Sequence, residues 1–118
     1  FLAVSILTSW NNNNLEQIGI THGVKDQVKI LIKLACNAKL SGVVASAQDI
    51  GLVREISKDI KIFCPGIRGD QDIQDQKRTL SYKEFSAIAD DKCFAVIGRP
   101  IYEGDPLENI KKIIDSLR

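Results

Sequence analysis

The chain has 118 residues, and its 16 Lys and Arg side chains nearly balance 15 Asp and Glu side chains. This length fits one domain with a sizeable core. Because there is no basic stripe and no long run of like charge, neither nucleic acid nor a membrane surface is an expected partner. No apolar stretch is long enough to span a bilayer and no positively charged leader precedes one, so we expect a cytoplasmic protein.

The three cysteines, Cys36, Cys64 and Cys93, are widely spaced and lie in apolar surroundings. An odd number of such cysteines favours reduced core thiols over a disulfide framework. With no CxxC motif and a single histidine, the sequence gives little support for a zinc site. The chain starts at Phe1, contains no methionine, and its first residues resemble the middle of a strand, which indicates a trimmed or processed chain or a fragment.

The first predicted unit opens with an apolar, β-rich run at residues 2–7, which predicts a buried strand. The hydroxyls of Thr8-Ser9 follow the carboxyl end of this strand. Asn14 is then a suitable N-cap for a short helix that starts at Leu15 and ends at Gly19.

Apolar residues at helical spacing predict an amphipathic helix over residues 24–40. Residues 42–47 do not alternate in polarity, so they predict a strand that is buried on both faces. A helix over residues 48–57 and a third strand over residues 60–64 follow. These elements repeat the order of strand and then helix.

The polar connection over residues 66–81 is longer than ordinary βα loops, and such loops are usually functional or disordered. A helix over residues 82–89, a fourth strand over 93–97 and a closing helix over 106–117 complete the chain, with proline at the first turn of the last helix. Four βα units in succession predict an α/β fold with a parallel sheet and helical crossovers.

Glycine, proline and arginine follow two consecutive strands, in Cys64-Pro65-Gly66-Ile67-Arg68 and in Val96-Ile97-Gly98-Arg99-Pro100-Ile101. Glycine backbone lets an oxyanion approach its N–H group, and the guanidinium fork matches phosphate oxygens. The alternative is that the glycines only turn the chain while the arginines form salt bridges. In eight-fold βα barrels a phosphate site commonly follows the last two strands, so the pattern fits the C-terminal half of a TIM (β/α)8 barrel.

Six segments resemble one known family from end to end of the chain, in matching order and spacing. They are Ile6-Leu7-Thr8-Ser9, Leu15-x-x-Ile18-Gly19, Gly42-Val43-Val44-x-Ser46-Ala47, Pro65-Gly66-Ile67-Arg68, Asp75-Gln76-Lys77-Arg78 and Val96-Ile97-Gly98-Arg99-Pro100-Ile101. The family is the orotidine 5′-phosphate decarboxylases, dimeric barrel lyases of pyrimidine biosynthesis. They make uridine monophosphate (UMP) from orotidine monophosphate (OMP) without metal or cofactor.

The resemblance implies a role for five residues of this chain. Thr8 is expected to contact the bound nucleotide at the end of the fifth barrel strand. Arg68 and Gln76 are expected in the loop that grips the phosphate, and the Gly98 backbone and Arg99 side chain are expected to complete that site. The amide of the glutamine can donate to a phosphate oxygen from a mobile loop.

The catalytic motif of the family, Asp-x-Lys-x-x-Asp on the third barrel strand, is absent. Asp59-Ile60-Lys61, Asp75-Gln76-Lys77 and Asp90-Asp91-Lys92 match only its first half. We therefore expect no catalytic residue in this chain and no activity without the other half. Two further departures, Ser81-Tyr82 for Thr-Pro and Asp90-Asp91 for a glycine-containing turn, are expected to loosen the last helix-strand unit.

Competing sites have less support. Three possible nucleophiles lack a plausible base: Ser9, Ser46 and Cys64. His22 follows a glycine and is expected at the surface or at a cap, and Trp10 is expected to pack, to line the pocket or to meet another subunit. Three acidic residues suggest either a cation site or a solvated loop: Asp70, Asp72 and Asp75.

Two rivals remain: a non-catalytic half barrel or remnant of an interrupted gene, and a related sugar-phosphate decarboxylase, which the Asp75-Gln76-Lys77-Arg78 segment disfavours. In a half barrel the first and last strands are unpaired edges of an apolar sheet. We therefore expect a homodimer, or pairing with a chain that provides the N-terminal half.

Overall fold

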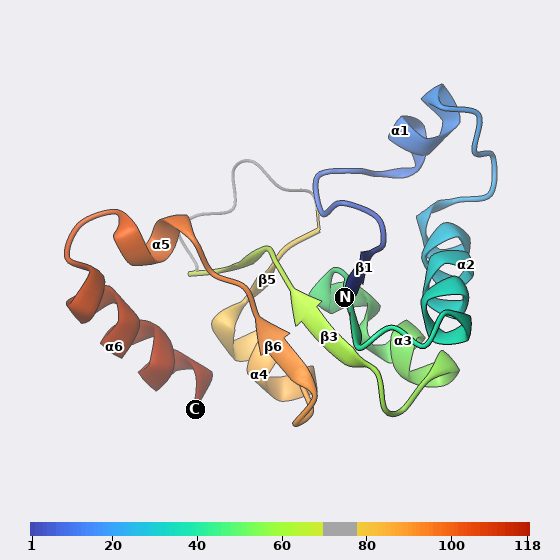
Figure 1. Ribbon diagram of the computed structural model, residues 1–118. Helices are drawn as coiled ribbons and strands as arrows, with labels where there is room; N and C mark the ends of the chain where they lie inside the picture. Colours follow the sequence, from blue (N-terminus) through green and yellow to red (C-terminus); the bar gives the residue numbers. More distant parts are fainter. Residues whose placement is uncertain (70–77) are drawn as a thin grey trace.

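The computed structural model describes residues 1–69 and 78–118. Its elements are β1 (Leu2–Val4), α1 (Asn12–Gln17), α2 (Val24–Asn37), β2 (Gly42–Val44), the 3₁₀ helix η1 (Ala47–Asp49), α3 (Ile50–Ile56), β3 (Lys61–Cys64), β4 (Ile67–Arg68), β5 (Leu80–Ser81), α4 (Tyr82–Ile88), β6 (Cys93–Ala95), α5 (Arg99–Tyr102) and α6 (Pro106–Leu117). One sheet has the strand order β1-β2-β3-β6, and β4 pairs with β5 in a second. Every pairing is parallel, which confirms the predicted α/β fold (Figure 1).

The four predicted strands correspond to β1, β2, β3 and β6, although each is only three or four residues long. The closing helix has its predicted bounds because Asp105 accepts hydrogen bonds from the N–H groups of Leu107 and Glu108. The predicted helix over 24–40 ends earlier, at Asn37, where Lys39 takes a left-handed conformation (φ 55°). Two-residue strands β4 and β5 and the one-turn helix α5 were not predicted.

The prediction that Asn14 caps the first helix is wrong, because Asn11 is the N-cap. The Asn11 side chain accepts from Asn14 N (3.2 Å), and the Asn14 side chain accepts from Asn11 N (3.0 Å). These reciprocal bonds form a capping box that starts the helix three residues earlier. Asn12 Oδ1 accepts from Val24 N (2.9 Å), so the same asparagine run also joins α1 to the start of α2.

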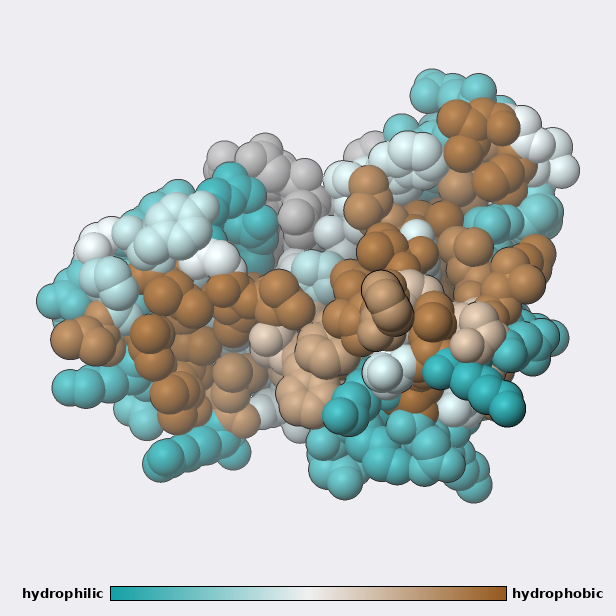
Figure 2. Space-filling model, viewed as in Figure 1, coloured by the Kyte–Doolittle hydropathy of each residue, from teal (hydrophilic) through white to brown (hydrophobic). Residues whose placement is uncertain are grey.

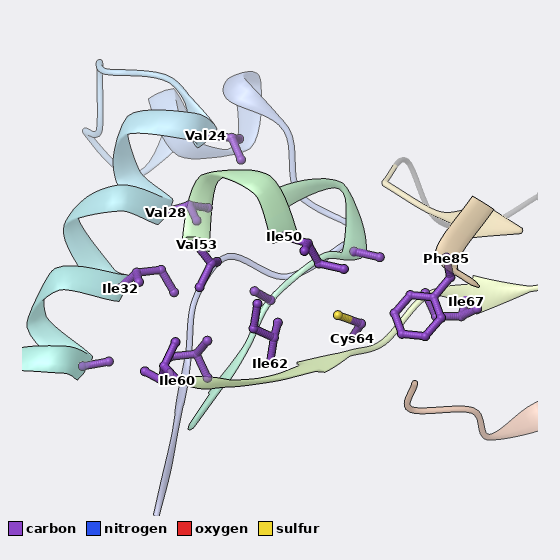
Figure 3. Packing of buried hydrophobic residues seen from close by; sticks show 14 of the residues in the cluster. Val24, Val28, Ile32, Ile50, Val53, Ile60, Ile62, Cys64, Ile67 and Phe85 are labelled. Atoms are coloured by element: carbon purple, nitrogen blue, oxygen red, sulfur yellow. The ribbon is translucent and has the colours of Figure 1, made fainter. Parts of the chain in front are cut away.

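The hydrophobic core lies between one face of the main sheet and the helices α2, α3 and α4 (Figure 3). From the sheet, Val43 and Ile62 are fully buried and lie on neighbouring strands in register. From the helices, Val28 and Ile32 of α2 and Val53 of α3 are likewise fully buried. Each such side chain stabilises the fold by about 1.5–3 kcal/mol, so this face holds the sheet to its helices.

The opposite face of the main sheet is apolar but uncovered within the described residues. Register places Val4, Val44, Phe63 and Phe94 in one row across all four strands. Val4 is 57% exposed and Phe94 41%, and the rings of Phe63 and Phe94 stack with centroids 5.1 Å apart. We call these four residues the inner row. Figure 2 shows the apolar surface that crosses the strands on this side and continues over α6.

A cluster of hydrogen bonds closes the amino end of the sheet. The Arg54 guanidinium donates to both carboxylate oxygens of Asp90, at 2.5 and 3.0 Å, and to the carbonyls of Ser57 (3.2 Å) and Ile60 (2.8 Å). The hydrogen bond from Arg54 holds the pKa of Asp90 well below its usual range. The Asp90-Asp91 turn, which stands in place of a glycine-containing turn, is therefore joined to α3 through Arg54.

The start of α4, where Ser81-Tyr82 stand in place of the Thr-Pro of the family, also forms hydrogen bonds. Ser81 caps α4 by accepting from Glu84 N (3.2 Å), and the Glu84 side chain accepts from Ser81 N (2.8 Å). This capping box satisfies the N–H groups of Ser81 and Glu84. The sequence departures at Ser81 and Asp90 were expected to loosen the last helix-strand unit, but each of these two residues forms hydrogen bonds of its own.

Gly42 is required by close packing between strands. A Cβ at this position would lie 2.8 Å from the backbone oxygen of Lys61 and 2.9 Å from Leu2 Cδ2. We expect Gly42→Ala to lower the free energy of unfolding by about 1–3 kcal/mol, because the backbone oxygen cannot move without breaking the strand pairing. Urea unfolding followed by circular dichroism measures this change.

Gly51→Ala is the matched control, since Gly51 lies in α3 and a Cβ added there would meet no described residue within 4 Å. This variant should gain up to about 1 kcal/mol from the better helix propensity of alanine. Equal effects of the two substitutions would contradict the close packing at Gly42.

Candidate phosphate-binding site

The two glycine and arginine turns lie side by side at the carboxyl edge of the main sheet. β3 leads through Pro65-Gly66 into β4, and β6 leads through Gly98 into α5. Because β3 and β6 are parallel neighbours, their carboxyl ends meet. Val96 N donates to Cys64 O at 2.9 Å, which joins the two chain segments just before they turn.

Between these turns is a hollow of about 310 Å³. It brings together three of the five residues expected at the phosphate: Arg68, Gly98 and Arg99. Its other lining residues are Pro65, Gly66, Ile67, Val96, Ile97, Pro100 and Tyr102. Two arginines and a glycine that line one concave surface are residue types that suit an oxyanion.

The two glycines differ in what they provide. Gly66 has a φ of 76°, in the left-handed region that favours glycine, so it makes the sharp turn between β3 and β4. Gly98 has no such conformation, and among the described residues a Cβ there would meet only Tyr102 Cε1, at 3.9 Å. The described part of the chain therefore leaves room beside the Gly98 backbone for a ligand atom.

Thr8 lies in a neighbouring hollow of about 270 Å³. This second hollow is lined by Val4, Ile6, Leu7, Thr8, Ser9, Val44, Ala45 and Pro65. Pro65 lines both hollows, so they are adjacent, and the second one opens over the inner row of the sheet. Gln76, the fifth expected residue, lies outside the described residues, as do Asp70, Asp72 and Asp75.

The incomplete matches to the catalytic motif that the structure describes lie at the wrong end of the sheet. Asp59 and Lys61 lie at the amino end of β3, and Lys92 directly precedes β6. Lys92 Nζ pairs with Asp59 Oδ1 at 2.6 Å. These groups are separated from Arg68 and Arg99 by the length of the strands, so they do not provide the missing chemistry at the hollow.

The other candidates from the sequence have structural roles. Cys64 is fully buried, and burial raises the pKa of its thiol to about 12, so it stays protonated and unreactive. Ser46 is fully buried and donates to the carbonyl of Arg78. His22 is exposed and bonds to Gln27 (2.6 Å), as expected for a surface histidine, and Trp10 packs against the core.

Two arginines outside the expected phosphate site form ion pairs with carboxylates. Arg54 pairs with Asp90, and Arg78 pairs with Asp49. Arg68 pairs with no carboxylate in the part of the chain that the structure describes. The pair of Asp49 and Arg78 was not predicted from the sequence. Arg78 appeared there only within a segment that resembles the family, and no pattern in the sequence singled out Asp49.

Within residues 1–69 and 78–118, no three His, Cys, Asp or Glu side chains come together in a group that could hold a metal ion. None of the helices in these two ranges has the length and apolarity needed to cross a bilayer.

The fold is that of half a βα barrel, with the two glycine and arginine turns at the carboxyl edge of its sheet. Comparison with known proteins gives the family: residues 1–113 match the sequence model of the orotidine 5′-phosphate decarboxylase / HUMPS family. The chain belongs to this family.

Relatives and solved structures agree. The chain is 43% identical over 118 residues to the orotidine 5′-phosphate decarboxylase of Wolbachia pipientis subsp. Culex pipiens, and 42% over 120 residues to that of Actinobacillus pleuropneumoniae serotype 5b. These alignments cover 98% and 99% of this chain but 51% of each relative. The crystal structure of the Lactobacillus acidophilus enzyme superposes with a TM-score of 0.76 at 26% identity, over 99% of this chain and 48% of that one. The chain thus spans about half the length of the relatives it matches.

Proposed function

We propose that residues 1–118 are the C-terminal half of an orotidine 5′-phosphate decarboxylase barrel and supply its phosphate-binding half. The reaction is the loss of carbon dioxide from OMP to give UMP in pyrimidine synthesis. The observation that supports this proposal most directly is the hollow shared by Arg68, Gly98 and Arg99, beside the hollow of Thr8. In this assignment the phosphate lies in the first hollow and the nucleoside extends towards the second.

The phosphate is far from the carbon that reacts, yet its binding energy assists the reaction. Contacts with a remote dianion can hold a closed site from which water is excluded, and so favour the transition state. Arg68, Arg99 and Gln76 would each contribute about 1.5–3 kcal/mol through a charge-assisted hydrogen bond. The chain lacks the Asp-x-Lys-x-x-Asp motif, which carries the lysine that protonates the pyrimidine carbon in the family.

A second candidate function is a half barrel that binds phosphate without catalysis. The observation that favours it is the place of Asp59, Lys61 and Lys92 at the amino end of the strands, opposite the hollow. The two candidates differ in whether another chain provides the missing motif. Both assign the same role to Arg68 and Arg99.

The uncovered inner row supports the proposal that another chain packs against this one. Parallel sheets are normally covered on both faces, and a closed barrel fills its interior with side chains from alternate strands. Among the described residues, β1 and β6 each also have one edge without a paired strand. The partner is a second copy of this chain or a chain that provides the first four βα units. A cytoplasmic location is part of the proposal, supported by three free cysteines.

Arg99→Ala should lower the affinity for UMP about 10- to 100-fold and leave that for uridine nearly unchanged, because only UMP has the phosphate. Titration of the purified chain, followed by NMR, measures both affinities. Arg118→Ala, which removes an exposed arginine at the end of α6, controls for the change in net charge. Equal losses for the two ligands would count against the assigned role.

The isolated chain should self-associate, or form a complex with a chain that provides the N-terminal half, and static light scattering measures this. Phe94→Glu should weaken association, since it places a charge in the inner row. Ile18→Glu, at the exposed end of α1, is the control with the same chemical change. The prediction would be contradicted by a monodisperse monomer that also forms no complex with a chain that provides the N-terminal half.

A further inference from the structure

Asp49 and Arg78 form a buried ion pair that no part of the proposed function uses. Arg78 Nη2 donates to Asp49 Oδ2, and the two side chains are only 10% and 8% exposed. Asp49 lies at the end of η1, directly before α3, and Arg78 lies two residues before β5. The pair therefore joins the connection after β2 to the segment that enters β5.

Two further hydrogen bonds join the same segments. Ser46 Oγ donates to the carbonyl of Arg78 at 3.3 Å, and Gln48 Nε2 donates to the carbonyl of Thr79 at 3.3 Å. Ser46 also accepts from Gln48 N, which fixes the 3₁₀ turn that presents all three side chains. Residues 78–79 are thus held through one guanidinium and two carbonyls, and we call these contacts the clamp.

The clamp is connected to the phosphate hollow through the small sheet. Leu80, directly after the clamped residues, donates its N–H to the carbonyl of Gly66 at 3.3 Å. β5 then pairs with β4 in the register Ile67 with Leu80 and Arg68 with Ser81. Because β4 has two residues and pairs with no other described strand, β5 is the backbone that orients Arg68.

We propose that Asp49 and Arg78 are positioning residues for Arg68: their buried pair fixes β5, and β5 fixes the strand that presents Arg68 to the phosphate. The inference rests on the proposed function for its ligand, and on the described contacts for its geometry. Ile67, which is buried beside Phe85, anchors the other side of β4, so the loss of the pair should loosen β4 without releasing it (Figure 3).

A buried ion pair is a poor way to gain stability alone, because desolvation of both charges offsets their attraction. It does fix geometry, because neither group can be left buried without its partner. Arg78 depends on Asp49 strongly: its buried Nη1 has no hydrogen-bond partner among the described residues. Loss of the Asp49 charge should therefore move the guanidinium towards solvent and release residues 78–79.

Asp49→Asn and Asp90→Asn are a matched pair of variants for the test. Both replace a carboxylate that pairs with an arginine, but the pair of Arg54 and Asp90 lies at the opposite end of the sheet. Both variants should lose some global stability. Only Asp49→Asn should loosen β5, so the comparison separates positioning from general destabilisation.

The experiment measures amide hydrogen exchange and ligand affinity in the full 118-residue chain. In Asp49→Asn, exchange at Leu80 relative to exchange at Ile62 of β3 should rise about tenfold, and the affinity for UMP should fall about tenfold while that for uridine stays constant. In Asp90→Asn the exchange ratio and the preference for UMP should stay at the original values. Gln48 is exposed, so Gln48→Ala should leave the core folded. It should raise the exchange at Leu80 relative to Ile62 by less than Asp49→Asn does.

An unchanged Leu80 ratio in Asp49→Asn and Gln48→Ala would overturn the inference. So would an equal rise in Asp90→Asn, because the effect would then be global. If the unaltered chain shows no preference for UMP over uridine, the proposed function fails and the phosphate role of the clamp fails with it. The exchange ratios would in that case still decide whether Asp49 fixes β5.

Discussion

The parallel pairing of four short strands is the constraint on which the rest of the structure depends. Strands of three or four residues gain little from their own hydrogen bonds, so the register between them fixes which side chains share a face. One face, with Val43 and Ile62, is covered by helices. The other has the inner row, which includes Phe63 and Phe94 and which the described helices leave uncovered, although parallel sheets are normally covered on both faces.

The same pairing aligns the strand ends and so creates the candidate site. Parallel strands place their carboxyl ends at one edge, where Arg68 from one turn and Arg99 from the next line a single hollow. Their amino ends meet at the opposite edge, where Arg54 and Asp90 form a bond network that only stabilises the fold. The proposed binding site and the stabilising Arg54–Asp90 network therefore lie at opposite ends of the same strands.

The fold was largely predictable because apolar runs bounded by glycine and proline mark buried strands, and Pro106 marks the start of the last helix. The N-cap was not, since four successive asparagines are similar candidates in the sequence and only the reciprocal hydrogen bonds of Asn11 and Asn14 show which one caps the helix. β4, β5 and α5 are too short to show any periodicity. The positions of Arg68, Gly98 and Arg99 after neighbouring strands could be predicted from local sequence. Asp49 and Arg78 lie 29 residues apart, and only the fold joins them.

Decarboxylation of OMP, followed by the decay of its ultraviolet absorbance, tests the central claim that this chain binds the phosphate but lacks the chemistry. The account predicts no decay with the 118-residue chain alone. It predicts decay when the chain is mixed with one that provides the first four βα units and the Asp-x-Lys-x-x-Asp motif. Decay with this chain alone would contradict the account, as would a complex of the two chains that shows none.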